Sequence, residues 1–393
     1  MSEISSLSLL IVSNCNIFER WRTNNHSLKA FGDEMLILRK PSIPTYYLSS
    51  IIFLFFLSKW AFAGQETRLD ISPSEGNVVN GIVLTPDGST LEGVYVSADD
   101  KRHIYRWNWS GGITDLATIP GVNGAIFRSS NVLNPVGAFQ GSDGRTHVFR
   151  WTQDAGIQEL GEIDSNETAF AYNASADGLV VTGGLKLAPP KKRELFLQPF
   201  RWTPAQGVKA INVTDRYSAA TWQVAKGGSE IAGTFLDDNS KSHVFTWAES
   251  SGVREVGIVP FVPYIRYGNN GSLIVAYVDD SGIAEIANLA AGTDHPIKIG
   301  SFEVGGKNAI IAAVSEDGTA ATGMFLDAAT FRWHAFYWTR DGGMEEINFP
   351  PSVITPTPTT ISADGSVVAG TYSSSIDRGA HSHTFATRFR FPR

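Results

Sequence analysis

Cysteine is almost absent from this chain of 393 residues. The single residue, Cys15, lies upstream of a segment that we expect to be removed. The mature protein should therefore hold no thiol. That excludes disulfide bonds, thiolate catalysis and cysteine-ligated zinc.

Positive charge is also scarce. The chain has 32 Lys and Arg against 39 Asp and Glu, for a formal net charge of −7. Because no basic excess exists to neutralise phosphates, the composition excludes a generic nucleic-acid-binding protein. It also supplies no positive patch for an anionic lipid surface.

Recognisable catalytic motifs are missing as well. The sequence contains no Gly-x-Ser-x-Gly elbow, no P-loop and no His-Glu-x-x-His pair. No residue set requires an enzymatic interpretation, so the sequence predicts no catalytic residue, no metal ligand and no cofactor.

The N-terminal region has the three parts of a secretory signal peptide. Residues 35–40 end in Arg39 and Lys40, residues 46–57 are an apolar core, and Ala61-Phe62-Ala63 offers a small-x-small cleavage site. We predict a signal peptide at 35–63 with cleavage after Ala63, and export to the periplasm, cell surface or medium. No membrane span would remain after cleavage; the alternative is an uncleaved anchor.

Residues 1–34 do not suit a position in front of a signal peptide. Glu19, Asp33 and Glu34 are acidic where a basic region is expected. We interpret 1–34 as an over-extended N-terminus and Met35 as the natural start.

Glycine and aromatic residues are plentiful: the chain has 38 Gly, and 11% of its residues are aromatic. This mix favours many short strands and tight turns. A marker aromatic recurs in the motif His147-Val-Phe-Arg-Trp151, and successive markers are separated by 41 to 51 residues. A period of about 40 to 50 residues is typical of four-stranded propeller blades. The markers are Tyr105, Phe149, Phe200, Phe245, Phe336 and, more weakly, Ile286 and Phe385.

The repeats also carry a turn whose second residue is glycine, as in Asp177-Gly178, which suits a tight hairpin; the second repeat, with Ser130-Asn131, is the exception. The second strand then holds a small residue: Gly93, Gly137, Gly183, Gly233, Ala276, Gly323 or Gly370. The seventh repeat lacks a fourth strand, whereas residues 67–72 form a spare strand before the first repeat. We therefore predict an all-β, seven-bladed β-propeller of four-stranded antiparallel blades over 64–393, closed by the N-terminal strand. A linear stack of seven β-units is the alternative.

The repeats resemble a known family. Residues 362–370 (Ser-Ala-Asp-Gly-Ser-Val-Val-Ala-Gly), the His-x-aromatic-x-Trp strands and Trp338-Thr-Arg-Asp-Gly-Gly-Met344 are similar to the HAF repeat. That repeat occurs in bacterial extracellular proteins and in some autotransporter passenger regions. The resemblance spans about residues 75–393 and implies export and a propeller-like fold. It implies no defined activity. The fifth repeat departs from the pattern, with Glu285-Ile-Ala-Asn288 where the aromatic and Trp are expected.

Five histidines stand two residues before a marker, which raises the question of a metal site. Equivalent positions in different blades are spread around a ring, too far apart to share one ion. Side chains alternate along a strand, so His147, Phe149 and Trp151 share one face. We predict a packing column between adjacent blades, with each imidazole bonded to backbone or to a hydroxyl. The five are His103, His147, His243, His334 and His383.

Loops that break the repeat are the predicted ligand contacts, because loops carry function on a rigid scaffold. In propellers, ligands sit at the mouth formed by second-to-third-strand loops and blade-to-blade crossovers. One candidate loop is basic, and another presents two aromatic residues and an Arg, which are residue types that anchor interfaces. A core role for Phe331 and Trp333 is an equal alternative. The candidates are Phe331, Arg332, Trp333, Tyr264, Lys191, Lys192 and Arg193.

The sequence favours an exported, monomeric and non-catalytic binding module for a protein or glycan partner. The alternative is a propeller enzyme, a lyase or hydrolase with its site at the channel mouth. An enzyme should bring titratable groups from several blades into one pocket. The functional inference rests on fold and family rather than on a site.

Overall fold

A computed structural model describes residues 64–393, apart from 72, 74–76, 127–134, 164–168, 188–195, 214–218, 226, 238, 240, 260–262, 269, 280, 290–295, 305–308, 380 and 391–393. Its regular structure in these ranges is entirely β, in strands β1 to β28. The predicted signal peptide at 35–63 and the extension at 1–34 lie outside the described residues. Nothing in the described ranges is a helix long and apolar enough to cross a membrane.

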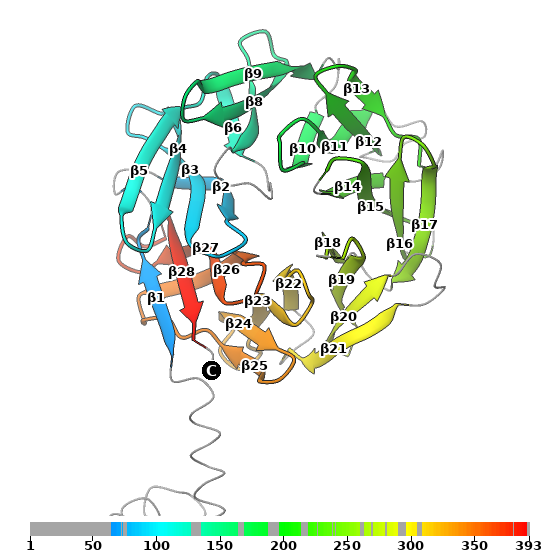
Figure 1. Cartoon of the computed structure of the whole chain (residues 1–393). Coiled ribbons are helices and arrows are strands. Elements are labelled where there is room, and N and C mark those ends of the chain that lie inside the picture. The colour runs from blue at the N-terminus through cyan, green and yellow to red at the C-terminus, as the bar shows by residue number, and fades with distance from the viewer. Residues whose placement is uncertain are drawn as a thin grey trace, which may run out of the picture. The chain divides into compact units, whose positions relative to one another are not determined.

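Seven four-stranded antiparallel sheets are arranged in a ring (Figure 1). Blade 1 consists of β2 (Asn77–Leu84), β3 (Thr90–Val96), β4 (Arg102–Asn108) and β5 (Gly112–Thr118). Blade 2 consists of β6 (Val122–Ile126), β7 (Val136–Gln140), β8 (Thr146–Thr152) and β9 (Gly156–Ile163), and blade 3 of β10 (Ala169–Ala174), β11 (Val181–Leu187), β12 (Phe196–Thr203) and β13 (Gly207–Ala210). Blade 4 consists of β14 (Ala219–Val224), β15 (Glu230–Leu236), β16 (Ser242–Ala248) and β17 (Gly252–Val259).

The remaining three blades follow the same order. Blade 5 consists of β18 (Tyr264–Tyr267), β19 (Leu273–Val278), β20 (Ile283–Leu289) and β21 (Ile297–Glu303). Blade 6 consists of β22 (Ala309–Val314), β23 (Ala320–Leu326), β24 (Trp333–Thr339) and β25 (Gly343–Glu346). Blade 7 consists of β26 (Val353–Ile361), β27 (Val367–Ser374), β28 (Ser382–Phe389) and β1 (Gln65–Leu69). The sequence prediction of a seven-bladed β-propeller is confirmed, including a complete fifth blade.

The N-terminal strand closes the ring as predicted. Strand β1 pairs antiparallel with β28, from Gln65 opposite Phe389 to Leu69 opposite Phe385. It begins two residues earlier than the predicted strand at 67–72. It ends before Asp70, whose φ of 53° breaks the extended conformation. Blade 7 thus has no strand left unpaired at the end of the ring.

The glycine turns lie where the sequence placed them. Gly88, Gly178, Gly318 and Gly365 all have φ between 68° and 76°, the region that favours glycine. Most of these turns also pack on the preceding blade. A Cβ at Gly365 would approach the Cβ of Ala320 in blade 6 to 2.5 Å. The turn therefore needs glycine for its backbone and for the close approach.

The marker aromatic of each regular blade lies opposite a glycine on the neighbouring strand. Tyr105 is paired with Gly93, and Phe336 with Gly323. A Cβ on Gly93 would come within 2.7 Å of the Tyr105 ring. The glycine leaves the space that the ring occupies, which explains the small residue in the second strand.

The aromatic columns fill the interfaces between blades, as predicted. Phe149 and Trp151 of blade 2 pack on Val94 and Ile104 of blade 1. Phe245 of blade 4 packs in the same way on Val180 of blade 3. Burying such rings supplies about 1.5–3 kcal/mol each relative to exposure, so these interfaces are the main core of the ring.

The predicted alignment of the fifth repeat is wrong by one residue. Tyr277 pairs with Glu285 as Phe235 pairs with His243, so Ala287 occupies the marker position and not Ile286. Ile286 instead faces blade 6, where it packs with Phe336 and Trp338. A shift of one residue moves every side chain of a strand to the opposite face.

Candidate functional site

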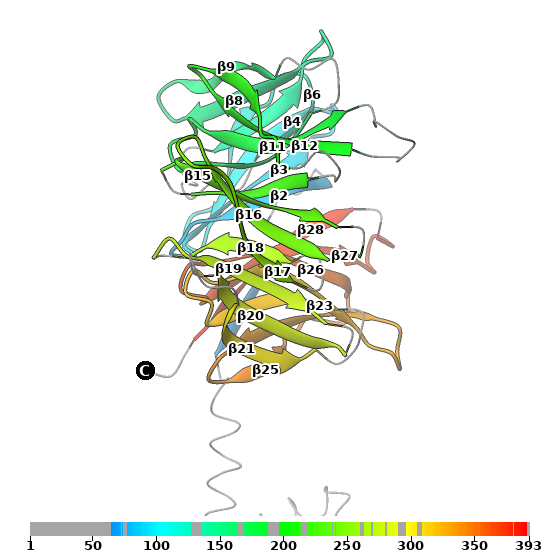
Figure 2. The ribbon, with the colours of Figure 1, turned by 90° about the vertical axis from the view of Figure 1, so that its right-hand side faces the viewer.

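The two faces of the ring are built differently. Because neighbouring strands of a blade run in opposite directions, the turns between first and second strands emerge on one face, here called the turn face. The loops between second and third strands and the crossovers between blades emerge on the other, the crossover face. Figure 2 shows the strands running between these two faces.

A cavity of about 100 Å³, here called the channel cavity, lies between the innermost strands at the centre of the ring, toward the turn face. It has room for several water molecules or for part of a small ligand. Residues from six blades line it, mostly from the last residues of the innermost strands. They are Val83, Leu84, Pro86, Asn173, Ala174, Gln223, Val224, Tyr264, Arg266, Tyr267, Glu316, Thr360 and Ile361.

Four of the polar lining residues occupy one equivalent position, two residues before the turn. Asn173, Gln223, Arg266 and Thr360 stand there in blades 3, 4, 5 and 7, whereas blade 1 has Val83. In blades 3, 4 and 7 the pairing of the innermost strand shifts at this point. Such bulges turn a side chain away from its regular direction. Comparing this position across the repeats could have found the set; the cavity itself needed the structure.

A fixed ion pair joins blades 5 and 6 at the cavity. Arg266 donates from Nη2 to Oε1 of Glu316 (3.2 Å) and from Nη1 to the carbonyl of Val314 (2.8 Å). Glu316 is only 6% exposed. These charge-assisted bonds hold the guanidinium in place and pair the buried carboxylate.

The hydroxyl of Tyr267 adds a polar group to the same cavity. It is buried and makes no well-formed hydrogen bond within the part of the chain that the structure describes. Burial raises the pKa of Tyr267 far above its usual range, and the nearby charge of Glu230 adds to the effect. The phenol therefore stays protonated and can donate a hydrogen bond to a ligand.

Of the predicted contact residues that the structure describes, one lines this cavity. Tyr264, half-buried at the start of β18, does so. Phe331, Arg332 and Trp333 lie together in the β23–β24 loop and at the start of β24, on the crossover face. Lys191, Lys192 and Arg193 lie outside the described residues.

Phe331 combines an exposed aromatic side chain with an unusual backbone conformation. Its side chain is 79% exposed, so it has no core role. Its φ is 53°, which is rare for a bulky residue, and its backbone N–H donates to the carbonyl of Asp327 (2.8 Å). Arg332 beside it is exposed, and Trp333 is half-buried. The loop thus presents an aromatic ring to solvent at some cost in backbone strain.

The five repeat histidines face carboxylates, which the prediction of backbone or hydroxyl partners did not include; His103 also lies 3.5 Å from the hydroxyl of Thr118, a partner of the predicted kind. In four blades Nδ1 faces an acid on the outermost strand, as in His103 with Asp115 at 2.9 Å, and in blade 7 it faces Asp70, directly after β1. Each ring also stacks on an aromatic of the second strand, as His243 does on Phe235 with centroids 4.6 Å apart. The other pairs are His147 with Glu159, His243 with Glu255, His334 with Glu346 and His383 with Asp70.

Comparisons with known proteins identify the fold. No family model matches the chain, and no curated protein matches it by sequence. An oligogalacturonate lyase solved in complex with manganese is similar, with TM-score 0.60, 14% identity, and coverage of 83% of this chain and 96% of that chain. The β-propeller domain of Swd1 (Cps50) from Myceliophteria thermophila gives TM-score 0.52, 12% identity, and coverage of 83% and 99%. At such identities the likeness shows a propeller and nothing finer.

Proposed function

We propose that this propeller is an exported, non-catalytic binding module whose channel cavity takes a sugar unit of a glycan. The observation that carries the proposal is the convergence of Asn173, Gln223, Arg266 and Thr360, from four blades, on one cavity. Ligand sites typically combine an apolar lining with a few convergent polar groups.

The chemistry of the lining suits a ligand rich in hydroxyls. A sugar hydroxyl both donates and accepts hydrogen bonds. The side-chain amides of Asn173 and Gln223 offer donors and acceptors, and the Tyr267 hydroxyl offers a donor. Val83 and Tyr264 add apolar surface for the ring face of a sugar. The fixed guanidinium of Arg266 also suits the carboxylate of an acidic sugar.

Binding fits this cavity better than catalysis. Among its described lining residues there is no histidine, cysteine or serine to serve as nucleophile or general base. The charged residues Arg266 and Glu316 are bonded to each other. An enzyme of the lyase or hydrolase class would need titratable groups free to move protons. The propeller enzyme therefore remains the second candidate.

Export and membership of the HAF-repeat proteins belong to the same proposal. The signal-peptide pattern at 35–63 and the repeats from about residue 75 onward support both. N-terminal sequencing of the exported protein should find Gly64 as the first residue. A mature chain that begins anywhere else contradicts cleavage after Ala63.

Binding of neutral and acidic oligosaccharides by isothermal titration calorimetry tests the proposed ligand class. We expect Gln223→Ala to weaken binding of the best oligosaccharide about fivefold, because a lost hydrogen bond costs about 1 kcal/mol. Gln223 is half-buried at the cavity, so its truncation should leave folding intact.

Matched controls keep the test specific. Arg254→Ala on the exposed outer strand β17 and Phe331→Ser on the crossover face should bind as the wild type does. Equal binding by wild type and Gln223→Ala would reject the cavity as the site. Cleavage of an oligosaccharide during the titration would favour the enzyme instead.

A further inference from the structure

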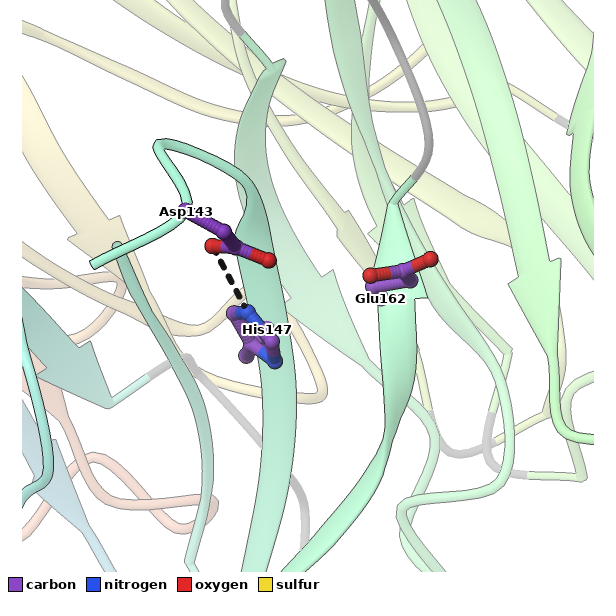
Figure 3. Close-up of side chains that lie close together, drawn as sticks. All are labelled: Asp143, His147 and Glu162. Atoms are coloured by element: carbon purple, nitrogen blue, oxygen red, sulfur yellow. Dashed lines mark hydrogen bonds and ion pairs between the residues drawn. The ribbon is translucent and has the colours of Figure 1, made fainter. Parts of the chain in front are cut away.

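Blade 2 carries a cluster of metal-ligand side chains that no other blade shares among the described residues. Asp143, His147 and Glu162 each offer one ligand atom, and these atoms lie within 4.8 Å of one another. Figure 3 shows Asp143 on the loop between β7 and β8, His147 on β8 and Glu162 on the neighbouring strand β9. All three come from one blade, so the spacing around the ring does not separate them.

The charge around His147 is unbalanced. Its Nε2 lies 3.2 Å from Oδ1 of Asp143, and its Nδ1 lies 3.4 Å from Oε2 of Glu159. A neutral imidazole has one N–H, so it can satisfy only one of these two carboxylates. Glu162 adds a third carboxylate on the same side as Asp143, and one of its oxygens pairs with the exposed Arg145. A divalent cation on Nε2 would balance these charges.

Glu159 completes the arrangement expected of a ligating histidine. A metal-bound imidazole usually donates its other N–H to a carboxylate, which fixes the tautomer and the ring orientation. With Nδ1–H directed at Glu159, Nε2 keeps its lone pair for a metal. The stacking of the ring on Phe139, with centroids 5.2 Å apart, restricts its rotation further.

Gly141 leaves space beside the ligand atoms. A Cβ on this residue would lie 2.6 Å from both Oδ1 of Asp143 and Nε2 of His147. The equivalent residue in blade 4 is Asp237, as the shared turn hydrogen bonds Gly141 N to Arg145 O and Asp237 N to Lys241 O show. In blade 4 the residue opposite His243 is Ile258, where blade 2 has Glu162 opposite His147. Blade 4 thus lacks both the third ligand and the open space.

We propose that Asp143, His147 and Glu162 bind a zinc-class divalent cation on the crossover face of blade 2. One imidazole nitrogen with two carboxylates suits Zn²⁺, whereas Ca²⁺ and Mg²⁺ take oxygen ligands only. Ligand distances of about 2.0–2.2 Å require the side chains to close in slightly. Arg145 donates to Oε1 of Glu162 (2.6 Å), but both side chains are more than a third exposed, so this pair opposes the metal little.

Titration calorimetry with Zn²⁺ on the full chain carrying Cys15→Ser tests the site. The substitution removes the one thiol that would compete for the metal. We expect one equivalent to bind, with a rise in melting temperature because the metal binds the folded state. Glu162→Gln should weaken binding at least about tenfold, as should Gly141→Ala, which places a methyl group on the ligand atoms.

The control is Glu255→Gln in blade 4, which alters a comparable histidine–acid pair and should bind Zn²⁺ as the parent chain does. Cobalt(II) absorption gives a second readout, with a visible band that shifts or disappears in Glu162→Gln. Failure of the parent chain to bind Zn²⁺, or an equal loss in Glu255→Gln and Glu162→Gln, would overturn the proposal. This site is independent of the channel cavity.

Discussion

Blades 4 and 5 are neighbours with the same strand order and different interiors. Blade 4 has the regular pair of Gly233 opposite Phe245, and blade 5 has Val275 opposite Ala287. The larger residue of the pair lies on the third strand in blade 4 and on the second strand in blade 5. In both blades this larger residue belongs to a buried apolar cluster shared with the preceding blade. The comparison teaches that the blade depends on the summed volume of a cross-strand pair more than on the aromatic itself.

The same exchange extends to the outer part of the two blades. His243 in blade 4 stacks on Phe235 and bonds to Glu255. In blade 5, Glu285 takes the position of the histidine and accepts a hydrogen bond of 2.6 Å from the hydroxyl of Tyr277. Either arrangement joins an aromatic side chain to a carboxylate.

The largest expected effect comes from truncating the aromatic residue of the blade 4 pair. Phe245→Ala should lower the free energy of unfolding by about 3–5 kcal/mol, because Phe245 is fully buried and leaves a cavity. Adding Gly233→Val should recover part of the loss by copying blade 5. Urea unfolding of the single and double variants measures both values. A double variant no more stable than Phe245→Ala would contradict the volume argument.

Adding a large side chain to the buried pair of blade 5 should lower the free energy of unfolding by a smaller amount. Ala287→Phe puts a ring opposite Val275 in a position that is only 4% exposed, and we expect a loss of about 1–3 kcal/mol. Val275→Gly in the same chain should relieve the strain by restoring the pair found in six blades. Melting temperatures of the two variants give the comparison, and Ala287→Ser serves as the control without added bulk.

The smallest expected effect is the pH-dependent stability that Asp237 of blade 4 contributes. Hydrogen bonds from the Lys241 amide and from His243 lower the pKa of Asp237 below its usual range, and burial opposes them only in part. A carboxyl with a lowered folded-state pKa stabilises the fold above about pH 4 and loses that contribution as pH falls through the folded value.

Urea unfolding of wild type and Asp237→Asn between pH 6 and pH 2 measures this contribution. The wild type should be the more stable at the upper end, and the difference should vanish at the lower end. A difference that stays constant over this range would show that the carboxylate charge of Asp237 does not contribute.

Much of the architecture could be predicted from the sequence. The glycine turns repeat at a blade-like period, and a missing last strand matched a spare first strand, so closure followed from counting. Turn residues such as Gly88 and Gly365 can be recognised in the sequence because few residues other than glycine adopt a positive φ.

The register of the fifth blade could not be predicted in this way. Ile286 is apolar and close to the expected position, whereas Ala287, which occupies it, resembles no aromatic. Only the pairing with Val275 shows which face each residue takes, because strand periodicity fixes alternation and not its phase.

The candidate sites were harder still. The channel cavity depends on strand bulges that turn Asn173 and Gln223 inward, and bulges leave no sequence signal of their own. The blade 2 cluster depends on Glu162 lying directly opposite His147, fifteen residues further along the chain. A separation of that length becomes a contact only once the hairpin register is known.

Strand β1 gives the ring a particular weakness during assembly. The hydroxyls of Thr67 and Thr387, which are 320 residues apart in sequence, lie 3.1 Å from each other in the closed blade. Blade 7 is therefore complete only when β1, from the other end of the chain, pairs with β28. Before that pairing forms, β28 has an unpaired edge. At high protein concentration β1 of a second copy can fill that edge first. We therefore expect closure by the chain's own β1 to compete with domain swapping between two copies at high protein concentration.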